Sequence, residues 1–445
     1  MEKELMKSIR MQIAESLETN RNGNVNRSLT NLLYILEHDP ELAEVFRLNV
    51  LTDRVHVSDE VPWKQGKHPF NDDDLNNVAL RIEDYGIINA NNMLDNAIRL
   101  VAGLHEFHPI KDKLEALEWD GVPRVAHALH HFLGCEENEL VYQSLKLFMM
   151  GALERIYHPG CKFETMLCLV GGQGDGKSTF FRFLALDDEW FTDDLRRLDD
   201  ENVVRKMSGH WIIEMPEMLA TTSAKYIEEN KSFVSRQKDT YKVPYAKHAK
   251  DYPRQCVFGG TSNKKSCLPF DRTGNRRFIP IETNKELAEV HIYENEAESR
   301  QYFEQMWAEI MTEYEPEKCT LKLPEELEQQ LEQLRDDFMA EDNDVGLIQA
   351  YLDDLKQDSV CTGQIYQEAL GNLGKPRRHE SNDIMDIMSN KIVGWEHGGN
   401  NTKRFPGYGS QKYWMRKDAH QPGKEEDLDA EGFSQVPEQM EIPFQ

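Results

Sequence analysis

A glycine-rich run near the middle of the chain has the residue types and the spacing that bind phosphate. Residues 171–178 read Gly-Gly-Gln-Gly-Asp-Gly-Lys-Ser and match the pattern G-x-x-x-x-G-K-[ST]. Glycines let backbone N–H groups converge on phosphate oxygens, Lys177 neutralises the β- and γ-phosphates, and the Ser178 hydroxyl ligates Mg²⁺. We therefore expect ATP and Mg²⁺ as cofactors, with the nucleotide bound by Gly171, Gly172, Gln173, Gly174, Asp175, Gly176, Lys177, Ser178 and Thr179.

Polar residues follow two later apolar runs and complete a candidate catalytic set. Glu214 and Glu217 follow the run at residues 211–213, and Asn263 follows the run at residues 257–262. Triphosphate hydrolysis needs a carboxylate near the metal and a group that orients the attacking water. We assign Glu214, with Ser178, to the metal and Glu217 to the water, and the two glutamate roles are exchangeable. Asn263 is expected to hydrogen-bond the γ-phosphate or the water.

Three arginines surround a turn that enters a further apolar run at residues 278–281. An arginine that reaches the nucleotide of a neighbouring subunit stabilises the charge of the transition state. Arg276 is the first candidate for this role, followed by Arg277 and then Arg272. Such a role implies a homo-oligomer.

Two basic segments interrupt an acidic chain and point to DNA. Residues 239–245 alternate as in a strand, a basic turn follows, and the chain returns at Pro253, which predicts a hairpin that tracks a phosphate backbone. A second basic segment precedes a predicted helix near the C-terminus, where phosphate contacts would seat a winged helix on duplex DNA. The candidate DNA-binding residues are Lys242, Lys247, His248, Lys250, Lys375, Arg377 and Arg378.

The apolar runs predict the elements that position these side chains. The run at residues 166–170 is short, continuous and bounded by glycines, which is typical of a strand buried on both faces. A glycine-rich loop and a helix over residues 178–186 follow it, so the pattern is strand, loop and helix. Helices are also expected over residues 112–117, 125–133 and 139–156, where apolar residues recur every three or four positions. We expect an α/β fold of the P-loop NTPase class.

The flanking regions predict smaller units. In the first, helices are expected near residues 28–36 and 91–104, a third capped by residues 72–74, and short strands at residues 50–51 and 55–57. In the last, helices are expected at residues 345–355, 363–370 and 381–388, with Ser381 or Asn382 as the cap of the third. A hairpin joining residues 393–395 to 413–415 completes a winged-helix-like pattern.

These patterns divide the chain into five segments. We expect an N-terminal accessory domain at residues 1–108, a helical segment at 109–160, a P-loop ATPase core at 161–336, a winged-helix-like domain at 337–420 and a disordered acidic tail at 421–445.

Composition excludes several classes of protein. The 445 residues carry a net charge of -27 with 39% hydrophobic residues, and they contain no apolar run long enough to cross a bilayer. The first residues have no apolar signal core, so we expect a cytoplasmic protein without a membrane partner. The seven cysteines include no C-x-x-C pair, which favours reduced thiols over a disulfide framework or a zinc finger.

The chain resembles the virulence-associated protein E family of phages, prophages and phage-derived islands in seven short motifs. They are LEWDGVPR at residues 117–124, PGCK at 159–162, the glycine-rich loop, EMPE at 214–217, YKVPY at 241–245, GTSN at 260–263 and TGNRRF at 273–278. The resemblance implies an AAA+ core related to superfamily 3 helicases, which form rings around DNA. In those helicases a Lys-His pair tips a hairpin before the third strand, and Lys247-His248 occupies the corresponding place.

Together these observations predict a replication ATPase of a phage or mobile element in a bacterial host cell. It would hydrolyse ATP and move single-stranded or forked DNA with the basic hairpin, as a homo-oligomeric ring, expected to be a hexamer, with replication proteins bound through the N-terminal domain. One alternative is a DNA-binding loader or origin-recognition module that binds ATP without unwinding. Another is a host-takeover factor that acts through protein contacts.

Overall fold

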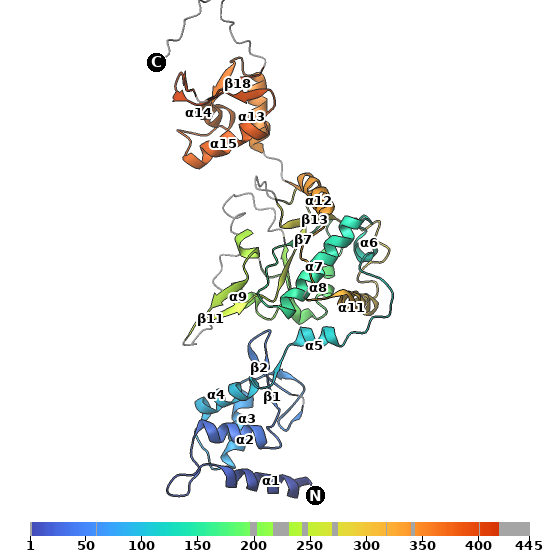
Figure 1. The fold of residues 1–445 in the computed structure, drawn as a ribbon, viewed down its shortest axis with the longest axis vertical. Coiled ribbons are helices and arrows are strands. Elements are labelled where there is room, and N and C mark those ends of the chain that lie inside the picture. Colours follow the sequence, from blue (N-terminus) through green and yellow to red (C-terminus); the bar gives the residue numbers. More distant parts are fainter. Residues whose placement is uncertain are drawn as a thin grey trace, which may run out of the picture. The chain divides into compact units, whose positions relative to one another are not determined.

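The computed structural model describes residues 2–58, 60–195, 203–216, 231–242, 248–268, 275–316, 318–339, 343–399 and 401–417. The chain divides into two compact units, Met1–Ala340 and Glu341–Gln445 (Figure 1). Four parts of the sequence-based expectations lie outside the described residues. They are Glu217, Lys247, Arg272 and the tail at residues 421–445.

The part of the first unit up to residue 107 has an apolar core of its own. Its helices are α1 (Glu2–Ser16), α2 (Leu29–His38), α3 (Asp72–Glu83) and α4 (Asn91–Ala102). Its strands are β1 (Phe46–Asn49), β2 (Arg54–Val57), β3 (Glu60–Val61), β4 (Lys64–Gln65), β5 (His68–Pro69) and β6 (Glu106–Phe107). Four of these strands form a sheet in the order β5-β2-β1-β6, and α2 and α4 contribute buried side chains to the same cluster.

Two local expectations in this region are wrong. Residues 50–51 lie in a turn, because β1 ends at Asn49, whose side chain accepts hydrogen bonds from the backbone N–H groups of Leu51 and Thr52. The cap of α3 is Asn71, one residue before the predicted aspartates. Its side chain accepts from the backbone of Asp73 and Asp74, so the aspartates occupy the first turn of the helix instead.

A five-stranded parallel sheet forms the centre of the first unit and confirms the predicted α/β class. Its strands are β7 (Met166–Val170), β8 (Phe191–Thr192), β9 (Ile212–Pro216), β12 (Val257–Ser262) and β13 (Phe278–Glu282). Their order is β13-β7-β12-β9-β8, with every pairing parallel. All five residues of β7 are buried, as the continuous apolar run predicts.

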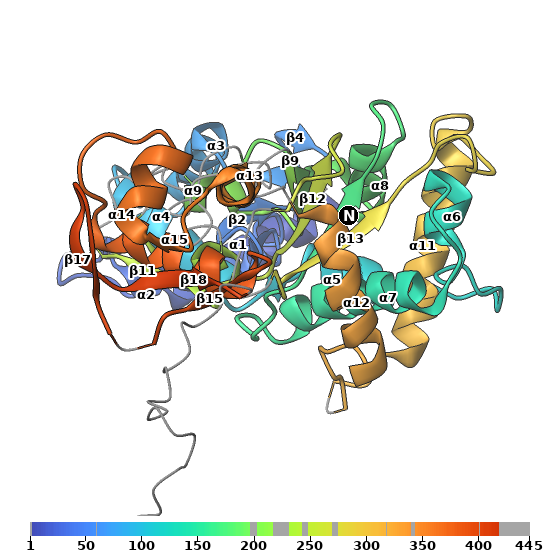
Figure 2. The same cartoon turned by 90° about the horizontal axis from the view of Figure 1, so that it is seen from above.

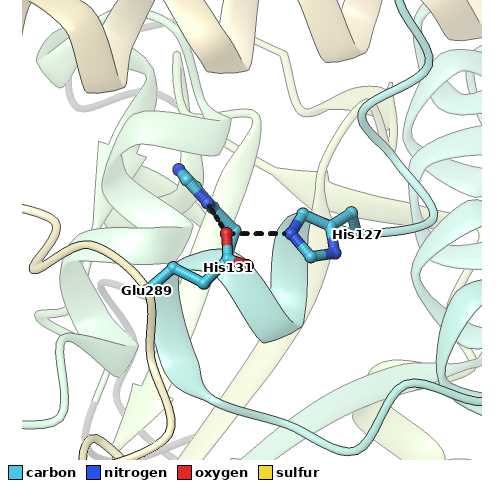
Figure 3. Close-up of side chains that lie close together, drawn as sticks. All are labelled: His127, His131 and Glu289. Carbon is cyan, nitrogen blue, oxygen red and sulfur yellow. Dashed lines mark hydrogen bonds and ion pairs between the residues drawn. The ribbon is translucent and has the colours of Figure 1, made fainter.

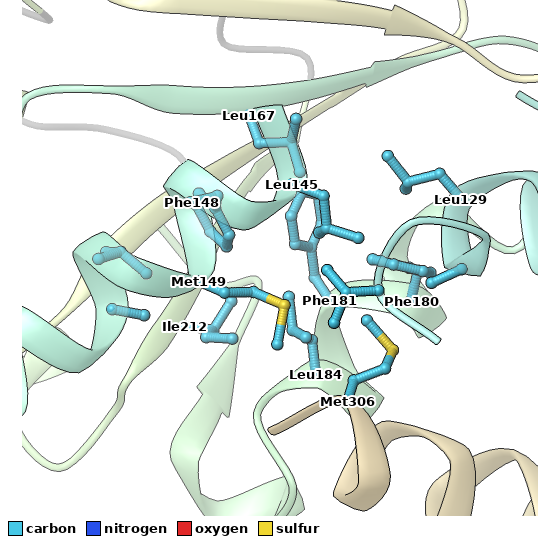
Figure 4. Close-up of a cluster of buried hydrophobic side chains, with 14 of the residues drawn as sticks. Leu129, Leu145, Phe148, Met149, Leu167, Phe180, Phe181, Leu184, Ile212 and Met306 are labelled. Carbon is cyan, nitrogen blue, oxygen red and sulfur yellow. The ribbon is translucent and has the colours of Figure 1, made fainter. Parts of the chain in front are cut away.

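Helices cover both faces of this sheet. They are α5 (Pro109–Glu115), α6 (Ala128–Leu133), α7 (Glu139–Tyr157), α8 (Lys177–Leu184), the 3-10 helix η1 (Asp188–Trp190), α9 (Val203–Met207), α11 (Glu296–Glu313) and α12 (Glu325–Phe338). Leu167 of β7 packs among side chains of α7 and α8 on one face (Figure 4). Cys168 points to the other face, into a cluster with residues of α9 and α12. The alternation along β7 therefore divides the core into two layers.

Aromatic contacts join α6, the start of β9 and α11 into the larger layer. Phe132 of α6 stacks on Phe303 of α11, and the two helices are neighbours in the view from above (Figure 2). Trp211, just before β9, lies 4.5 Å from Trp307 of α11, measured between ring centroids. Both indoles are fully buried and donate hydrogen bonds to backbone carbonyls, so their polar edges are satisfied.

The predicted basic hairpin is present between the second and third predicted strands. It consists of β10 (Lys238–Tyr241) and β11 (Lys250–Pro253), which pair antiparallel with Tyr241 opposite Lys250. The return strand therefore begins at Lys250, and the expectation that the chain returns at Pro253 is wrong, because Pro253 is the last residue of that strand. Residues 243–247, which join the two strands, lie outside the described part of the chain.

The second unit combines helices with a small antiparallel sheet. Its helical segments are α13 (Asn343–Asp354), α14 (Thr362–Gln364), the π-helix η3 (Ile365–Ala369) and α15 (Arg378–Asn390). Its strands are β14 (Ser359–Cys361), β15 (Trp395–His397), β16 (Lys403–Phe405), β17 (Gly409–Gln411) and β18 (Tyr413–Arg416). The main sheet has the order β14-β18-β15, and one apolar cluster lies between it and the helices.

Three details of this unit differ from the sequence-based expectations. The predicted second helix is one α-turn followed by π-helix, and the third helix begins at Arg378, before Ser381. Trp395 and Tyr413 do lie on paired strands, but a separate hairpin of β16 and β17 stands between those strands in the chain. The chain between these two strands therefore makes more turns than the single hairpin that was expected.

Two sequence-based exclusions can be compared with the structure. All seven cysteines are free. None of the helices in the described ranges has both the length and the apolar run that crossing a bilayer requires.

Candidate functional site

A cleft of about 680 Å³ lies at the carboxyl ends of β7, β9 and β12. Ligands gather at this edge of a parallel sheet because the loops that follow the strands converge there. The cleft brings together the glycine-rich loop, Glu214 and Asn263, as their positions after apolar runs predict. Its lining residues are Gln173, Gly174, Asp175, Gly176, Lys177, Ser178, Thr179, Asp193, Glu214, Pro216, Thr261, Ser262, Asn263, His291 and Tyr293.

The glycines of the loop are required by its backbone and by close neighbours. Gly174 and Gly176 have φ values of +84° and +87°, which side chains rarely adopt. A Cβ on Gly171 would lie 2.0 Å from Oγ1 of Thr283. That threonine donates a 2.9 Å hydrogen bond to Asp175 Oδ2, so the loop is held from inside by a buried pair.

Lys177 opens α8 and turns its ammonium back into the loop. Its Nζ donates to the carbonyl oxygens of Gly171 (2.9 Å) and Gly172 and to Oδ1 of Asn263 (3.1 Å). Burial lowers the pKa of Lys177, while the carboxylates of Asp175 and Glu214 act in the opposite direction. Lys177 is only 6% exposed, so the positive charge of its ammonium acts mainly on the part of the cleft that it faces.

Glu214 lies within β9, because that strand continues to Pro216 instead of ending before the glutamate. Its Oε1 accepts hydrogen bonds from the hydroxyls of Ser178 (2.7 Å) and Thr261. Its Oε2 is buried and has no hydrogen-bond partner. Burial raises the pKa of Glu214, against the effect of the two hydroxyls. The buried carboxylate oxygen that has no partner and the serine hydroxyl beside it are both oxygen ligands that suit Mg²⁺.

Six residues that line the cleft were not singled out from the sequence: Asp193, Pro216, Thr261, Ser262, His291 and Tyr293. Thr261 could have been found from its place near the carboxyl end of β12, and its hydroxyl donates to Glu214. Tyr293 lies in the segment after β13, and its hydroxyl accepts a 2.7 Å hydrogen bond from Thr179 Oγ1. His291 lines the same part of the cleft. The last two follow no recognisable motif, because only the fold brings that segment to the loop.

Arg276 and Arg277, the two candidate arginines that the structure describes, lie at the amino ends of the strands, opposite the end that carries the cleft. Arg277 precedes β13, and its backbone carbonyl accepts from Met166, the first residue of β7. Its Nε contacts Ser235 Oγ (2.8 Å) and Glu164 Oε2 (3.3 Å). Arg276 is 67% exposed, with a 3.7 Å ion pair to Glu164. Neither side chain lines the cleft of its own chain.

The described basic residues of the hairpin differ in their surroundings. Lys242 and His248 are exposed. Lys250 is also exposed, but its Nζ lies 3.0 Å from Oδ2 of Asp53, a residue of the N-terminal region. That carboxylate also binds Arg99 at 2.9 Å. The expected DNA contact by Lys250 therefore competes with an ion pair inside the same unit.

The three candidate DNA-binding residues of the second unit lie at or just before the start of α15. Lys375, Arg377 and Arg378 are all exposed, and Arg378 is the first residue of the helix rather than a residue before it. The backbone N–H of Arg377 donates to Glu380, which fixes this entry to the helix.

The chain was compared with protein families, curated proteins and solved structures. A family model described as the virulence-associated protein E-like domain matches residues 114–340, more than half of the chain. Among curated proteins the search found no match.

Several solved structures of the NrS-1 C terminal region in apo form are similar to the chain. Two A-form structures have TM-scores of 0.43 and 0.44 at 13% and 11% identity, and each similarity covers 83% of this chain and 96% of that chain. A third apo structure has a TM-score of 0.42 at 14% identity and covers 83% and 95%. A likeness at this level assigns no role to any residue of the cleft.

Proposed function

This chain belongs to the virulence-associated protein E-like family, and we propose that it is an ATPase that acts on DNA during replication of a phage or phage-derived element. The observation that supports this most strongly is the convergence of Lys177, Ser178, Glu214 and Asn263 on one cleft. These four side chains come from three separate segments of the chain. A glycine turn with a purely structural role would not need a buried cation, a buried carboxylate and an amide around it.

The cleft has separate groups for the triphosphate and for Mg²⁺. Lys177 would exchange one of its present oxygen partners for a β- or γ-phosphate oxygen, and the backbone of residues 172–176 would surround the phosphates. Ser178 and Glu214 would hold Mg²⁺, because the unpartnered Oε2 offers a charged oxygen next to a hydroxyl. When bound, Mg²⁺ neutralises charge on the β- and γ-phosphates.

Hydrolysis then requires an oriented water. Asn263 holds the Lys177 ammonium through its Oδ1, so its amide nitrogen is available to a phosphate oxygen or to the water. Glu217 or Glu214 would orient the water, and the hydrogen bond from Ser178 supports the metal-side role for Glu214. Glu217 lies outside the described residues, so its role rests on the sequence motif alone.

An oligomer would complete the site. Arg276 is the more exposed of the two described candidate arginines, and it lies at the amino ends of the strands, away from its own cleft. Only a neighbouring subunit could therefore bring it to a γ-phosphate, in the manner of an arginine supplied in trans. We propose a homo-oligomeric ring, with a hexamer as the expected size, and replication proteins as partners of residues 1–108.

The hairpin of β10 and β11 is the proposed DNA contact, with Lys242 and His248 among its exposed residues. Lys247 lies outside the described residues, so its part in this contact rests on the sequence alone. Basic side chains on such an element bind the phosphate backbone without regard to sequence. Coupling of hydrolysis to movement of this hairpin would make the protein a helicase or translocase on single-stranded or forked DNA.

One observation favours the alternative of a DNA loader without unwinding activity. Lys250 is paired with Asp53 of the N-terminal region, and because Lys250 is the first residue of β11 after the turn, this ion pair holds the turn end of the hairpin instead of leaving it free to move. Strand displacement on a forked DNA separates the two functions. Displacement that is lost in Lys177→Ala supports the helicase, whereas ATP hydrolysis without displacement supports the loader. ATP hydrolysis at the wild-type rate by Lys177→Ala would refute both.

A further inference from the structure

Two histidines and a glutamate converge on one point outside the cleft. Oε2 of Glu289 lies 2.9 Å from Nε2 of His127 and 2.7 Å from Nδ1 of His131. All three potential ligand atoms lie within 4.8 Å of one another. Figure 3 shows the Glu289 carboxylate between the two imidazoles, so the three groups face a common centre.

The fold fixes the three side chains from two segments. His127 immediately precedes α6 and His131 lies four residues later, so both project from one side of the helix. Glu289 lies between β13 and α11, where its backbone N–H and that of Val290 donate to the carbonyl of His131. The ring of His131 stacks on Tyr302 at 4.9 Å with an interplanar angle of 8°, which sets the direction of its nitrogen.

The carboxylate of Glu137 determines which nitrogen of His127 can offer a lone pair to the common centre. Oε1 of Glu137 lies 2.6 Å from Nδ1 of His127, so this nitrogen carries a proton and donates it. With Nδ1 directed to Glu137, Nε2 is the nitrogen of His127 that faces Glu289, at 2.9 Å from its Oε2. This is the nitrogen that can offer a lone pair to a cation between the two side chains.

We propose that His127, His131 and Glu289 bind a divalent transition-metal ion, with Zn²⁺ as the expected occupant, through Nε2, Nδ1 and Oε2 respectively. Two imidazoles and one carboxylate are established ligands of zinc, at about 2.0–2.1 Å from nitrogen and up to about 2.2 Å from oxygen. Ligand atoms at tetrahedral angles would then be about 3.3 Å apart. The present nitrogen–oxygen distances need to widen by only a few tenths of an ångström.

The surroundings resemble those of other metal-binding histidines. The bond from His127 to Glu137 is the carboxylate–histidine pairing that orients a ligand and raises its basicity. The side chains of His131, His127 and Glu289 are 20%, 37% and 47% exposed, so an ion can reach them and a fourth, water ligand has room. A bound ion would tie α6 to the segment that carries His291 and Tyr293 into the cleft.

Equilibrium dialysis of the full chain against Zn²⁺, without nucleotide, tests the proposal. We expect one zinc ion per chain in the wild type, and a dissociation constant more than tenfold higher in His127→Gln and in Glu289→Gln. Glu137→Gln should weaken binding about tenfold, because it removes only the orienting partner. His130→Gln is the matched control, since the Nδ1 of this neighbouring histidine bonds to the Cys135 carbonyl instead.

Thermal melting gives an independent readout of zinc binding. Zn²⁺ should raise the melting temperature of the wild type and of His130→Gln, and it should leave that of His127→Gln unchanged. Equal zinc binding by the wild type, His127→Gln and Glu289→Gln would overturn the proposal. So would a wild type that binds no zinc. Neither result affects the proposed ATPase, whose residues do not take part.

Discussion

The hydroxyl of Ser178, in the first turn of α8, donates a 2.7 Å hydrogen bond to Oε1 of Glu214, in the middle of β9. This bond joins the helix that follows the glycine-rich loop to a strand two places away from β7 in the sheet. It also leaves the second carboxylate oxygen of Glu214 buried without a partner. A buried carboxylate in this state costs stability in the protein alone and becomes useful only when a cation arrives.

Glu214→Gln should therefore separate activity from stability. The neutral amide removes a buried charge, so we expect the nucleotide-free protein to melt a few degrees higher, which corresponds to about 1 kcal/mol. ATP turnover should fall about 100-fold or more, because the metal-side charge is lost. Differential scanning fluorimetry and a phosphate-release assay measure the two effects. A lower melting temperature with unchanged turnover would contradict the role of Glu214.

Arg276→Ala should abolish turnover by removing a group that acts on the neighbouring subunit. We expect ATP binding to remain and turnover to fall by about 10³-fold, as for arginines supplied in trans. Mixing Arg276→Ala with Lys177→Ala tests the geometry directly. A Lys177→Ala subunit still offers Arg276 to an intact cleft, so part of the activity should return. No recovery in the mixture, with both variants folded and assembled, would show that Arg276 does not act across an interface.

Asp53→Asn should increase the affinity for single-stranded DNA by releasing Lys250. Asp53 has a φ of +55°, a conformation that asparagine tolerates well, so the substitution should not disturb the backbone. We expect a several-fold gain in affinity at low salt, which shrinks as salt screens the charges. Fluorescence anisotropy measures it. The double variant Asp53→Asn with Lys250→Ala is the control, and an equal gain there would mean that Lys250 is not the released group.

Gly259→Ala should destabilise the central sheet. A Cβ at this position of β12 would lie 2.5 Å from the buried ring of Phe181, which cannot move aside in a packed core. We expect a loss of about 1–3 kcal/mol in the free energy of unfolding, measured by denaturant titration. Gly346→Ala is the matched control, because nothing lies within 4 Å of its Cβ and it is exposed in α13. That change should be neutral or slightly stabilising.

The sequence predicted the central sheet and the meeting of the glycine-rich loop, Glu214 and Asn263 at one cleft for a physical reason. Strands such as β7 are buried on both faces, so they are continuous apolar runs with clear ends. Polar residues that follow such runs meet at one edge of a parallel sheet, which is why Lys177, Glu214 and Asn263 could be grouped before their distances were known.

What the sequence did not predict depends on contacts between distant segments. Nothing near Lys250 indicates that Asp53, almost two hundred residues earlier, would bind its ammonium. The same holds for Tyr293 and for Glu289, which reach the cleft and the histidines only because the segment after β13 folds back over α6 and α8. Local patterns also misplaced short features, such as the start of α15 at Arg378, since exposed helix ends carry weak apolar signals.

Isothermal titration calorimetry of the full chain with ATP and Mg²⁺ tests the central claim most directly. We predict one nucleotide bound per chain, with a dissociation constant between about 1 μM and 1 mM. In Lys177→Ala the constant should rise about 100-fold, because the ammonium that now bonds to Gly171 and Asn263 is the main cation of the cleft. Equal binding by the wild type and Lys177→Ala, or no binding by either folded protein, would contradict the account.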